Sequence, residues 1–316
     1  MVAIRRRPLG ASGIEVSELA LGSWKTYERI PRDIGIAVMQ KARDLGINFL
    51  DDARYNDDSG TAPMKSGYSE VVFGELFRAS GWKRDEVVLA NKLWWEFWPE
   101  QRAAAELEAS LGRMGMDYLD LAYAERPPAG LTMQEIVRDV GALIAAGKLR
   151  AWGVLNWKPE QITTATEAAA AEGVPPPCAA QLAYSLVRRS PVEDPEMAHA
   201  LDVAQAGIVA SFALDGGALT GKYAEPGATG RLAGRLSDES HQPALKAASD
   251  LRALAERIAR KPAPMAIAFA LLNARVSSVL FGATTPEQLV ENASAVELVA
   301  AIDDETIADL RRIGLR

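Results

Sequence analysis

Short apolar runs alternate with longer segments of helical periodicity along the whole chain. Each run is bounded by Gly, Pro or charged residues, a pattern typical of strands that are buried on both faces. One of these strands opens the stretch 46–56 and ends on two carboxylates, Asp51 and Asp52. The other predicted strands are 17–23, 86–92, 118–124, 151–155, 179–182, 207–212 and 276–281.

Between these runs, apolar residues recur at helical spacing. In 31–45, for example, Ile34, Val38 and Met39 are apolar within an otherwise polar segment. Residues 4–16 predict a small hairpin, and the Gly-rich segments 57–67 and 213–242 predict loops. The predicted helices are 31–45, 69–78, 99–114, 132–146, 159–172, 195–206, 244–260, 264–273, 286–298 and 303–313.

About eight strand-then-helix units follow one another without a break in composition. This order predicts a single-domain α/β protein, a (β/α)8 TIM barrel over residues 1–316. A doubly wound sheet is the alternative. No G-x-G-x-x-G follows the first strand, so the usual dinucleotide fingerprint of that fold is missing.

Composition narrows the class of protein. The chain has 316 residues, 48% of them hydrophobic, and a formal net charge of −7, which disfavours nucleic acid and anionic membranes as partners. The single cysteine, Cys178, excludes an internal disulfide. Residues 1–9 carry three consecutive Arg and no apolar run, so a secretory signal is not expected. We therefore expect a cytoplasmic protein with no membrane association, which can be a homo-oligomer.

Charged side chains lie at the ends of three successive predicted strands. Asp51, Lys92 and Glu125 end or directly follow the second, third and fourth strands. In a parallel barrel these ends converge on one mouth, where chemistry is placed. A Lys beside an Asp can lower the pKa of a neighbouring phenol, and Tyr55 is the phenol nearest in sequence. A Tyr tuned in this way can donate a proton to a carbonyl while a hydride arrives from a nicotinamide.

The chain resembles the aldo-keto reductases along nearly its whole length. The resemblance implies a (β/α)8 barrel that binds NADP(H) at the mouth without a Rossmann domain, with NAD(H) as the second possibility. It also implies interconversion of a small-molecule carbonyl and alcohol by Asp, Tyr, Lys and His. The motifs that carry it are LGASGIEVSELALGSW, GINFLDDARY, Ser69-Glu70, Asn91-Lys92, MDYLDLAYAERP, GVLNW, QLAYSLVRR, GALTGKY and SSVLFGATTPEQLVENASA.

The catalytic positions match this family only in part. Asp51 and Lys92 occupy the Asp and Lys positions, but Glu125 stands at the His position. The family's Tyr lies five residues after the Asp, where this chain has Asn56, so Tyr55 serves as the acid only if a one-residue shift is tolerated. Glu125 resembles the steroid 5β-reductase branch. A buried, protonated Glu there would polarise a carbonyl and favour reduction of an enone C=C bond.

The resemblance also implies a set of cofactor-binding residues. Leu155 replaces the Ser of the nicotinamide-amide site, while the other positions of that site remain. No Arg or Lys lies between Gly282 and Asn292, which weakens the implied preference for NADP(H) over NAD(H), and 213–242 can close over the cofactor as a lid. The implied residues are Ser23, Trp24, Asn156, Gln181, the stacking Tyr184, Leu214, Gly217, Leu219, Lys222, Gly282, Ala283, Gln288, Glu291 and Asn292.

Several of these residues have simpler interpretations. Glu125 can pair with Arg126 at the rim, and Tyr184 can be an ordinary core aromatic. The aromatic run 93–98 predicts either a pocket wall for an apolar or ring-shaped substrate or packing against the next helix.

Other motifs give little support for different chemistry. GGALTGK lacks the Ser or Thr of a P-loop, and the two histidines have no metal-ligand spacing. Because the Tyr and His positions have changed, a non-catalytic nicotinamide sensor or regulatory protein is the alternative to an enzyme.

Overall fold

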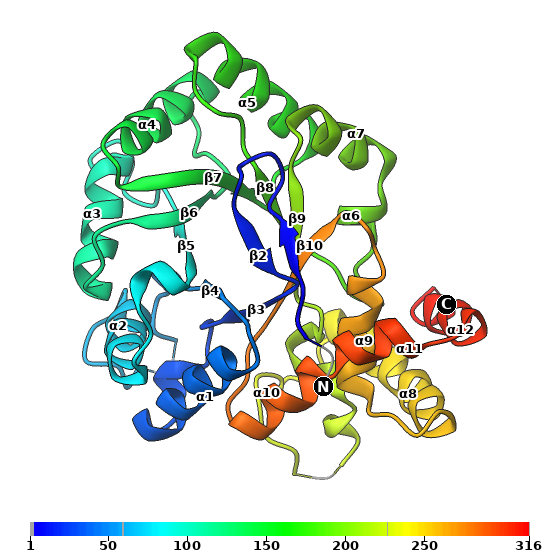
Figure 1. Ribbon diagram of the computed structural model, residues 1–316. Helices are drawn as coiled ribbons and strands as arrows, with labels where there is room; N and C mark the ends of the chain where they lie inside the picture. Colours follow the sequence, from blue (N-terminus) through cyan, green and yellow to red (C-terminus); the bar gives the residue numbers. More distant parts are fainter. Residues whose placement is uncertain (1–2, 59, 226, 316) are drawn as a thin grey trace.

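Parallel strands close into a barrel in the order β10-β3-β4-β5-β6-β7-β8-β9 in the computed structural model, which describes residues 3–58, 60–225 and 227–315 (Figure 1). Each neighbouring pair is parallel, including β10 with β3, which closes the ring. The single-domain (β/α)8 barrel expected from the sequence is confirmed. The strands are β3 Leu19–Gly22, β4 Phe49–Asp51, β5 Val88–Leu93, β6 Leu119–Ala124, β7 Leu149–Leu155, β8 Ala179–Ala183, β9 Gly207–Ser211 and β10 Val276–Phe281.

Helices cover the outside of the barrel (Figure 1). The predicted helix 286–298 is in fact two helices, because the Ser294 hydroxyl donates to the Glu291 carbonyl (2.7 Å) and the chain bends there. The short helix α6 was not expected. None of the helices in the described ranges is long and apolar enough to cross a membrane. The helices are α1 Arg32–Asp44, α2 Tyr68–Ser80, α3 Ala103–Met114, α4 Met133–Ala145, α5 Pro159–Glu172, α6 Ser190–Glu193, α7 Pro195–Ala204, α8 Gln242–Arg257, α9 Pro262–Leu271, α10 Pro286–Ala293, α11 Ala295–Ala301 and α12 Asp304–Arg312.

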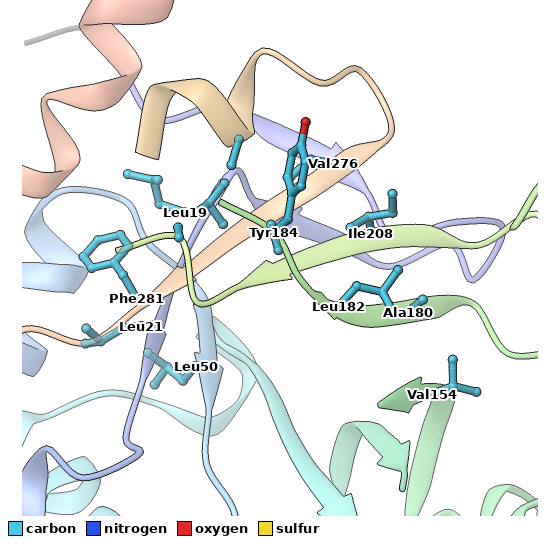
Figure 2. Packing of buried hydrophobic residues seen from close by; sticks show 14 of the residues in the cluster. Leu19, Leu21, Leu50, Val154, Ala180, Leu182, Tyr184, Ile208, Val276 and Phe281 are labelled. Carbon is cyan, nitrogen blue, oxygen red and sulfur yellow. The ribbon is translucent and has the colours of Figure 1, made fainter. Parts of the chain in front are cut away.

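The strands separate two apolar layers, because successive side chains point to opposite faces. Phe49, Leu121 and Val209 lie with other small and apolar residues inside the barrel. Leu50, which follows Phe49 in β4, and Leu182, which follows Gln181 in β8, point the opposite way. They pack in the layer between strands and helices (Figure 2). A side chain within a strand therefore points into the barrel only if it shares the inward parity, whereas residues that follow a strand are not bound by this rule.

A hairpin closes the amino end of the barrel. Strands β1 Arg6–Pro8 and β2 Glu15–Ser17 pair antiparallel, as predicted for 4–16, and lie across the ring of strands (Figure 1). Glu18, with 1% of its side chain exposed, holds the hairpin through ion pairs with Arg5 (3.1 Å) and Arg7 (2.9 Å). The opposite, carboxyl end of the strands is left to carry the site.

Replacing Gly74 with alanine is expected to destabilise the fold by about 3 kcal/mol, because overpacking at a close contact forces the backbone to move. Gly74 lies where α2 meets α3, and a Cβ there would sit 2.1 Å from the Met114 carbonyl oxygen. Gly112, within α3, has no atom within 4 Å of the same position. Gly112→Ala is the matched control and should stabilise by about 0.5–1 kcal/mol. Urea unfolding that shifts both variants in the same direction would contradict this account of the α2–α3 contact.

Candidate active site

Three predicted site residues from three strands meet inside the barrel mouth. The Lys92 ammonium group donates to Asp51 Oδ1, and both side chains are only 2% exposed. Lys92 Nζ also donates to the Asp52 carbonyl oxygen (3.0 Å), and Gln181 Nε2 donates to Asp51 Oδ2 (3.0 Å). The ends of β4, β5 and β8 thus hold one buried ion pair, and each Asp51 oxygen has its own donor.

The two adjacent carboxylates have different surroundings. Asp52 has the opposite parity to Asp51, is fully buried behind the barrel wall, and accepts a hydrogen bond from the Ser23 hydroxyl. Burial first, and the nearby Glu70 second, raise the pKa of the Asp52 carboxyl well above its ordinary value. Asp52 is therefore a buried acid that favours its neutral form, whereas Asp51 carries the ion pair.

Tyr55 lies at the mouth, while the residue at the family's Tyr position does not. The Tyr55 ring is half-buried, with its centroid 5.9 Å from Lys92 Nζ. Asn56 is exposed and forms an antiparallel bridge with Ser66. Burial, followed by the charge of Asp51, raises the pKa of the Tyr55 phenol well above its ordinary value. The expected lowering of this pKa is wrong, because these effects outweigh the opposing positive charge of Arg231.

Tyr123 is a second phenol beneath this pair, and the sequence analysis missed it. It lies inside the barrel in register with Lys92, whose Nζ is 5.8 Å from its ring centroid. Its hydroxyl is buried near Gln181, and burial, followed by the charge of Asp51, raises the pKa of this phenol well above its ordinary value. Strand parity offered a signal, because Tyr123 precedes Glu125 by two positions and so points to the same face.

Glu125 is at the rim and not buried as expected. Its side chain is 22% exposed, and Oε1 accepts from the Arg126 backbone N–H (3.0 Å) and lies 3.7 Å from the Arg126 guanidinium. This pairing of Glu125 with Arg126 is the simpler interpretation that the sequence also allowed. The enclosed carboxyl expected at this position is therefore not what the structure has.

Aromatic rings surround the Tyr55 phenol. Trp24 lies 6.5 Å and Trp94 6.2 Å from it, between ring centroids. Phe212, which follows β9, lies 5.5 Å from Trp24 and is 40% exposed. Its φ of +57° is a strained backbone conformation of the kind that clusters at functional sites, and no sequence pattern indicated it. In the run 93–98, Trp94 lies against Tyr55 and Trp95 packs in the core, so packing accounts for part of the run, and the substrate-pocket wall stays a prediction.

Tyr184 does not reach this mouth. It shares the parity of Leu182 and lies in the layer outside the barrel (Figure 2). Its ring is 5.2 Å from that of Phe269 in α9, and its hydroxyl donates to Glu193 (2.8 Å). The structure thus places Tyr184 as a core aromatic. The exposed ring at the corresponding part of the mouth is Phe212.

The remaining nicotinamide-site residue, Asn156, follows β7 directly. It is exposed, has a φ of +52°, and donates its backbone N–H to the Gln181 carbonyl (3.0 Å). Leu155, at the position where the family has Ser, points into the barrel and is 7% exposed. Asn156 and Gln181 therefore flank the same side of the mouth, with amide groups of the type that can bind a carboxamide.

A cation from a distant segment lies on the turn after β10. A Cβ at Gly282 would sit 3.2 Å from Arg231 Nη2 and 2.9 Å from Thr26 Oγ1. Arg231 also donates to the Trp24 carbonyl oxygen and to Thr26 Oγ1 (3.1 Å). A guanidinium beside a glycine turn that leads into α10 suits a phosphate, so the residues present fit a nicotinamide dinucleotide. The sequence analysis missed Arg231, which is far from Gly282 along the chain.

The other predicted cofactor residues divide by exposure. Glu291 lines a groove of about 760 Å³ on the outside of α10 and forms an ion pair with Lys261 there. The buried ion pair, and not this groove, marks the candidate site, because proton transfer needs charged groups in a closed setting. The residues that are at least partly exposed are Trp24, Leu214, Gly217, Lys222, Gly282, Gln288 and Glu291. The buried residues are Ser23, Leu219, Ala283 and Asn292. In the described ranges, no group of three or more His, Cys, Asp or Glu is placed to hold a metal ion.

Comparisons with known proteins agree with this geometry. The profile of the Aldo/keto reductase family matches residues 18–314. A probable voltage-gated potassium channel subunit beta from Oryza sativa subsp. japonica is 31% identical over 320 residues, which cover 96% of this chain and 95% of that protein.

Proposed function

This chain belongs to the aldo/keto reductase family, and on that premise we propose that it is a nicotinamide-dependent oxidoreductase of carbonyl and alcohol groups. The observation that carries the proposal is the buried Asp51–Lys92 ion pair beneath the half-buried Tyr55 phenol. The proposed cofactor is NADP(H) before NAD(H), and the proposed substrate is a small molecule with a carbonyl or hydroxyl group.

The proposed chemistry uses the side chains of the mouth in distinct roles. When bound, the cofactor supplies or accepts the hydride. Tyr55 donates its phenolic proton to the carbonyl oxygen, and Lys92, fixed by Asp51, stabilises the phenolate that remains. Asn156 and Gln181 orient the carboxamide of the nicotinamide. Trp24, Trp94 and Phe212 exclude water from the reacting atoms.

Arg231 is proposed to bind a phosphate of the cofactor. It supplies the positive charge that is missing between Gly282 and Asn292, and it reaches Gly282 from the segment 213–242. Because Arg231 also binds the Trp24 carbonyl and Thr26, it links that segment to the loop after β3. This arrangement supports a closing role for 213–242 over the cofactor.

Arg231→Gln is expected to raise the Kd for NADPH at least tenfold, because a hydrogen bond to a charged group contributes about 1.5–3 kcal/mol. The matched control is Arg235→Gln, which removes an exposed guanidinium of the same segment that pairs with Asp238 (2.9 Å). Its Kd should stay within about twofold of the unchanged protein, because exposed ion pairs contribute little. Fluorescence titration with NADPH and NADH measures both constants. Equal effects of the two substitutions would argue against a phosphate contact.

The raised pKa of Tyr55 gives a pH dependence with a definite sign. Since the folded protein favours the neutral phenol, the proton donor stays loaded from about pH 6 to about pH 9, and carbonyl reduction should lose no rate to this group there. Alcohol oxidation needs the phenolate and should rise with pH without a plateau below about pH 10. Steady-state rates in both directions, with saturating cofactor, test this. A loss of reduction near neutral pH that disappears in Tyr55→Phe would contradict it.

A regulatory role is the second candidate, and one observation favours it. The relative at 31% identity is named as a subunit of a potassium channel, so this chain is proposed, as the alternative, to bind a nicotinamide cofactor and a partner protein. Tight cofactor binding with no turnover over a broad carbonyl panel would favour this role. Turnover that Lys92→Met abolishes would favour the enzyme. Reduction of an enone C=C bond receives less support, because Glu125 is paired at the rim.

A further inference from the structure

We propose that Glu106 is a positioning residue for the proton donor and that it acts through the ring of Trp94. This inference rests on the proposed function, because it takes Tyr55 as the donor. Glu106 lies in the first turn of α3, outside the barrel, and sequence analysis marked it only as part of a helix. Its carboxylate is 4% exposed and binds the loop that carries Trp94.

Tyr55 depends on neighbouring rings for its orientation. Trp94 stands edge-to-face against it, with 6.2 Å between centroids and an angle of 68° between the ring planes. Trp24 lies on it at 6.5 Å and 51°. Edge-to-face pairs have a preferred geometry, so a shift of Trp94 changes the direction of the phenol. Trp94 therefore acts as a stop for the Tyr55 ring on the side of β5.

The backbone of Trp94 and Trp95 is held by a single carboxylate. Glu106 Oε1 accepts the Trp94 N–H at 2.7 Å, and Oε2 accepts the Trp95 N–H at 3.1 Å. Trp95 has a φ of +58°, a left-handed conformation that a side-chain-bearing residue adopts only when its surroundings impose it. The two hydrogen bonds supply that constraint, so the loop turns where Glu106 fixes it.

The same loop is fixed a second time at its outer end. Arg54, from the stretch that carries Asp51 and Tyr55, forms an ion pair with Glu96 and donates to the Ser66 hydroxyl (2.7 Å). Its guanidinium lies 5.3 Å from the Phe97 ring centroid. The outer end is thus tied to the strand end that bears the phenol, and the inner end to α3 through Glu106. Trp94 is held directly by the inner contact, and Glu96 and Phe97, just after it, are held by the outer one.

Glu106→Gln tests this arrangement with little change in shape. A Gln oxygen can accept one backbone N–H, but its amide nitrogen presents a donor to the other, so one of the two contacts is lost. We expect kcat for carbonyl reduction to fall about tenfold, because a small misplacement at a reacting group is costly. The Kd for NADPH should stay within about twofold, since Glu106 is not part of the proposed cofactor contacts. Glu106→Leu, which removes both acceptors, should have the larger effect.

A double-mutant cycle separates positioning from general stability. If Glu106 acts through Trp94, Glu106→Gln should change kcat by less than about twofold in a Trp94→Ala background. The matched control is Glu18→Gln, which removes another buried carboxylate at the opposite end of the barrel. Glu18→Gln should lower the Tm and leave kcat unchanged. An equal fall in kcat from Glu106→Gln in both backgrounds would overturn the proposal.

A second readout does not need turnover. If the unchanged protein reduces no carbonyl, the proposed function fails, and the positioning is decided by the ¹³Cζ resonance of Tyr55, assigned by its loss in Tyr55→Phe. Glu106→Gln should shift this resonance because the neighbouring Trp94 ring moves, whereas Glu18→Gln should not. A resonance unmoved by Glu106→Gln would overturn the positioning role by itself.

Discussion

Lys92→Met is expected to lower kcat for carbonyl reduction by about 10²–10⁴-fold, the range that general acid–base catalysis contributes. The substitution keeps the length of the side chain but removes the cation that Asp51 fixes beneath the Tyr55 phenol. Stopped-flow oxidation of NADPH measures the loss. The matched control is Lys148→Met directly before β7, where Nζ lies 3.4 Å from Glu108 Oε2 and the side chain is 39% exposed. It should retain turnover.

Stability and turnover can be separated at this ion pair. Removing Lys92 alone leaves Asp51 buried without its cation, which should cost about 3–5 kcal/mol of folding free energy. The double variant Asp51→Asn/Lys92→Met has no buried charge at this point and should recover most of that stability. It should recover none of the turnover. A double variant that regains both would show that the pair is structural only.

Tyr55→Phe is expected to reduce kcat by about 10²–10⁴-fold while the fold is retained, because only the proton donor is removed. The aromatic contacts with Trp24 and Trp94 involve the ring, which phenylalanine keeps. Single-turnover rates with saturating NADPH isolate the chemical step from cofactor binding.

Two further substitutions test whether a residue other than Tyr55 is needed for proton donation. Asn56→Ala, at the family's Tyr position, should change kcat by less than about twofold, because Asn56 is exposed and lies in the bridge with Ser66. Tyr123→Phe should retain turnover, since its hydroxyl is enclosed beneath Lys92. Loss of turnover in Tyr123→Phe together with its survival in Tyr55→Phe would transfer the acid role to Tyr123.

The architecture could be predicted from the sequence because it depends on local patterns of apolar and polar residues. Alternating buried strands and amphipathic helices predicted the barrel, and the strand ends predicted the meeting of Asp51 and Lys92. Parity along β8 places Tyr184 outside the barrel with Leu182, whereas the resemblance to the family implied a stacking role at the mouth. The break at Ser294 depends on one side-chain hydrogen bond, which periodicity does not reveal.

The features that the sequence did not reveal depend on contacts between distant segments. Arg231 and Gly282 are far apart along the chain and meet only in the folded protein, and Phe212 is turned by a strained backbone. The direction of the Tyr55 pKa shift depends on the burial of the ring and on its distances from Asp51 and Arg231, which are set only in the folded chain. The rim position of Glu125 likewise follows from its contact with Arg126.

The most direct test of the proposed oxidoreductase is the loss of NADPH absorbance at 340 nm in the presence and absence of a panel of aldehydes and ketones. The unchanged protein is predicted to oxidise NADPH only when an acceptor is present, with one alcohol formed for each NADPH consumed. Asp51→Asn/Lys92→Met is predicted to bind NADPH and oxidise none. Tight binding of NADPH by the unchanged protein without acceptor-dependent oxidation across the panel would contradict the enzyme and leave the regulatory role.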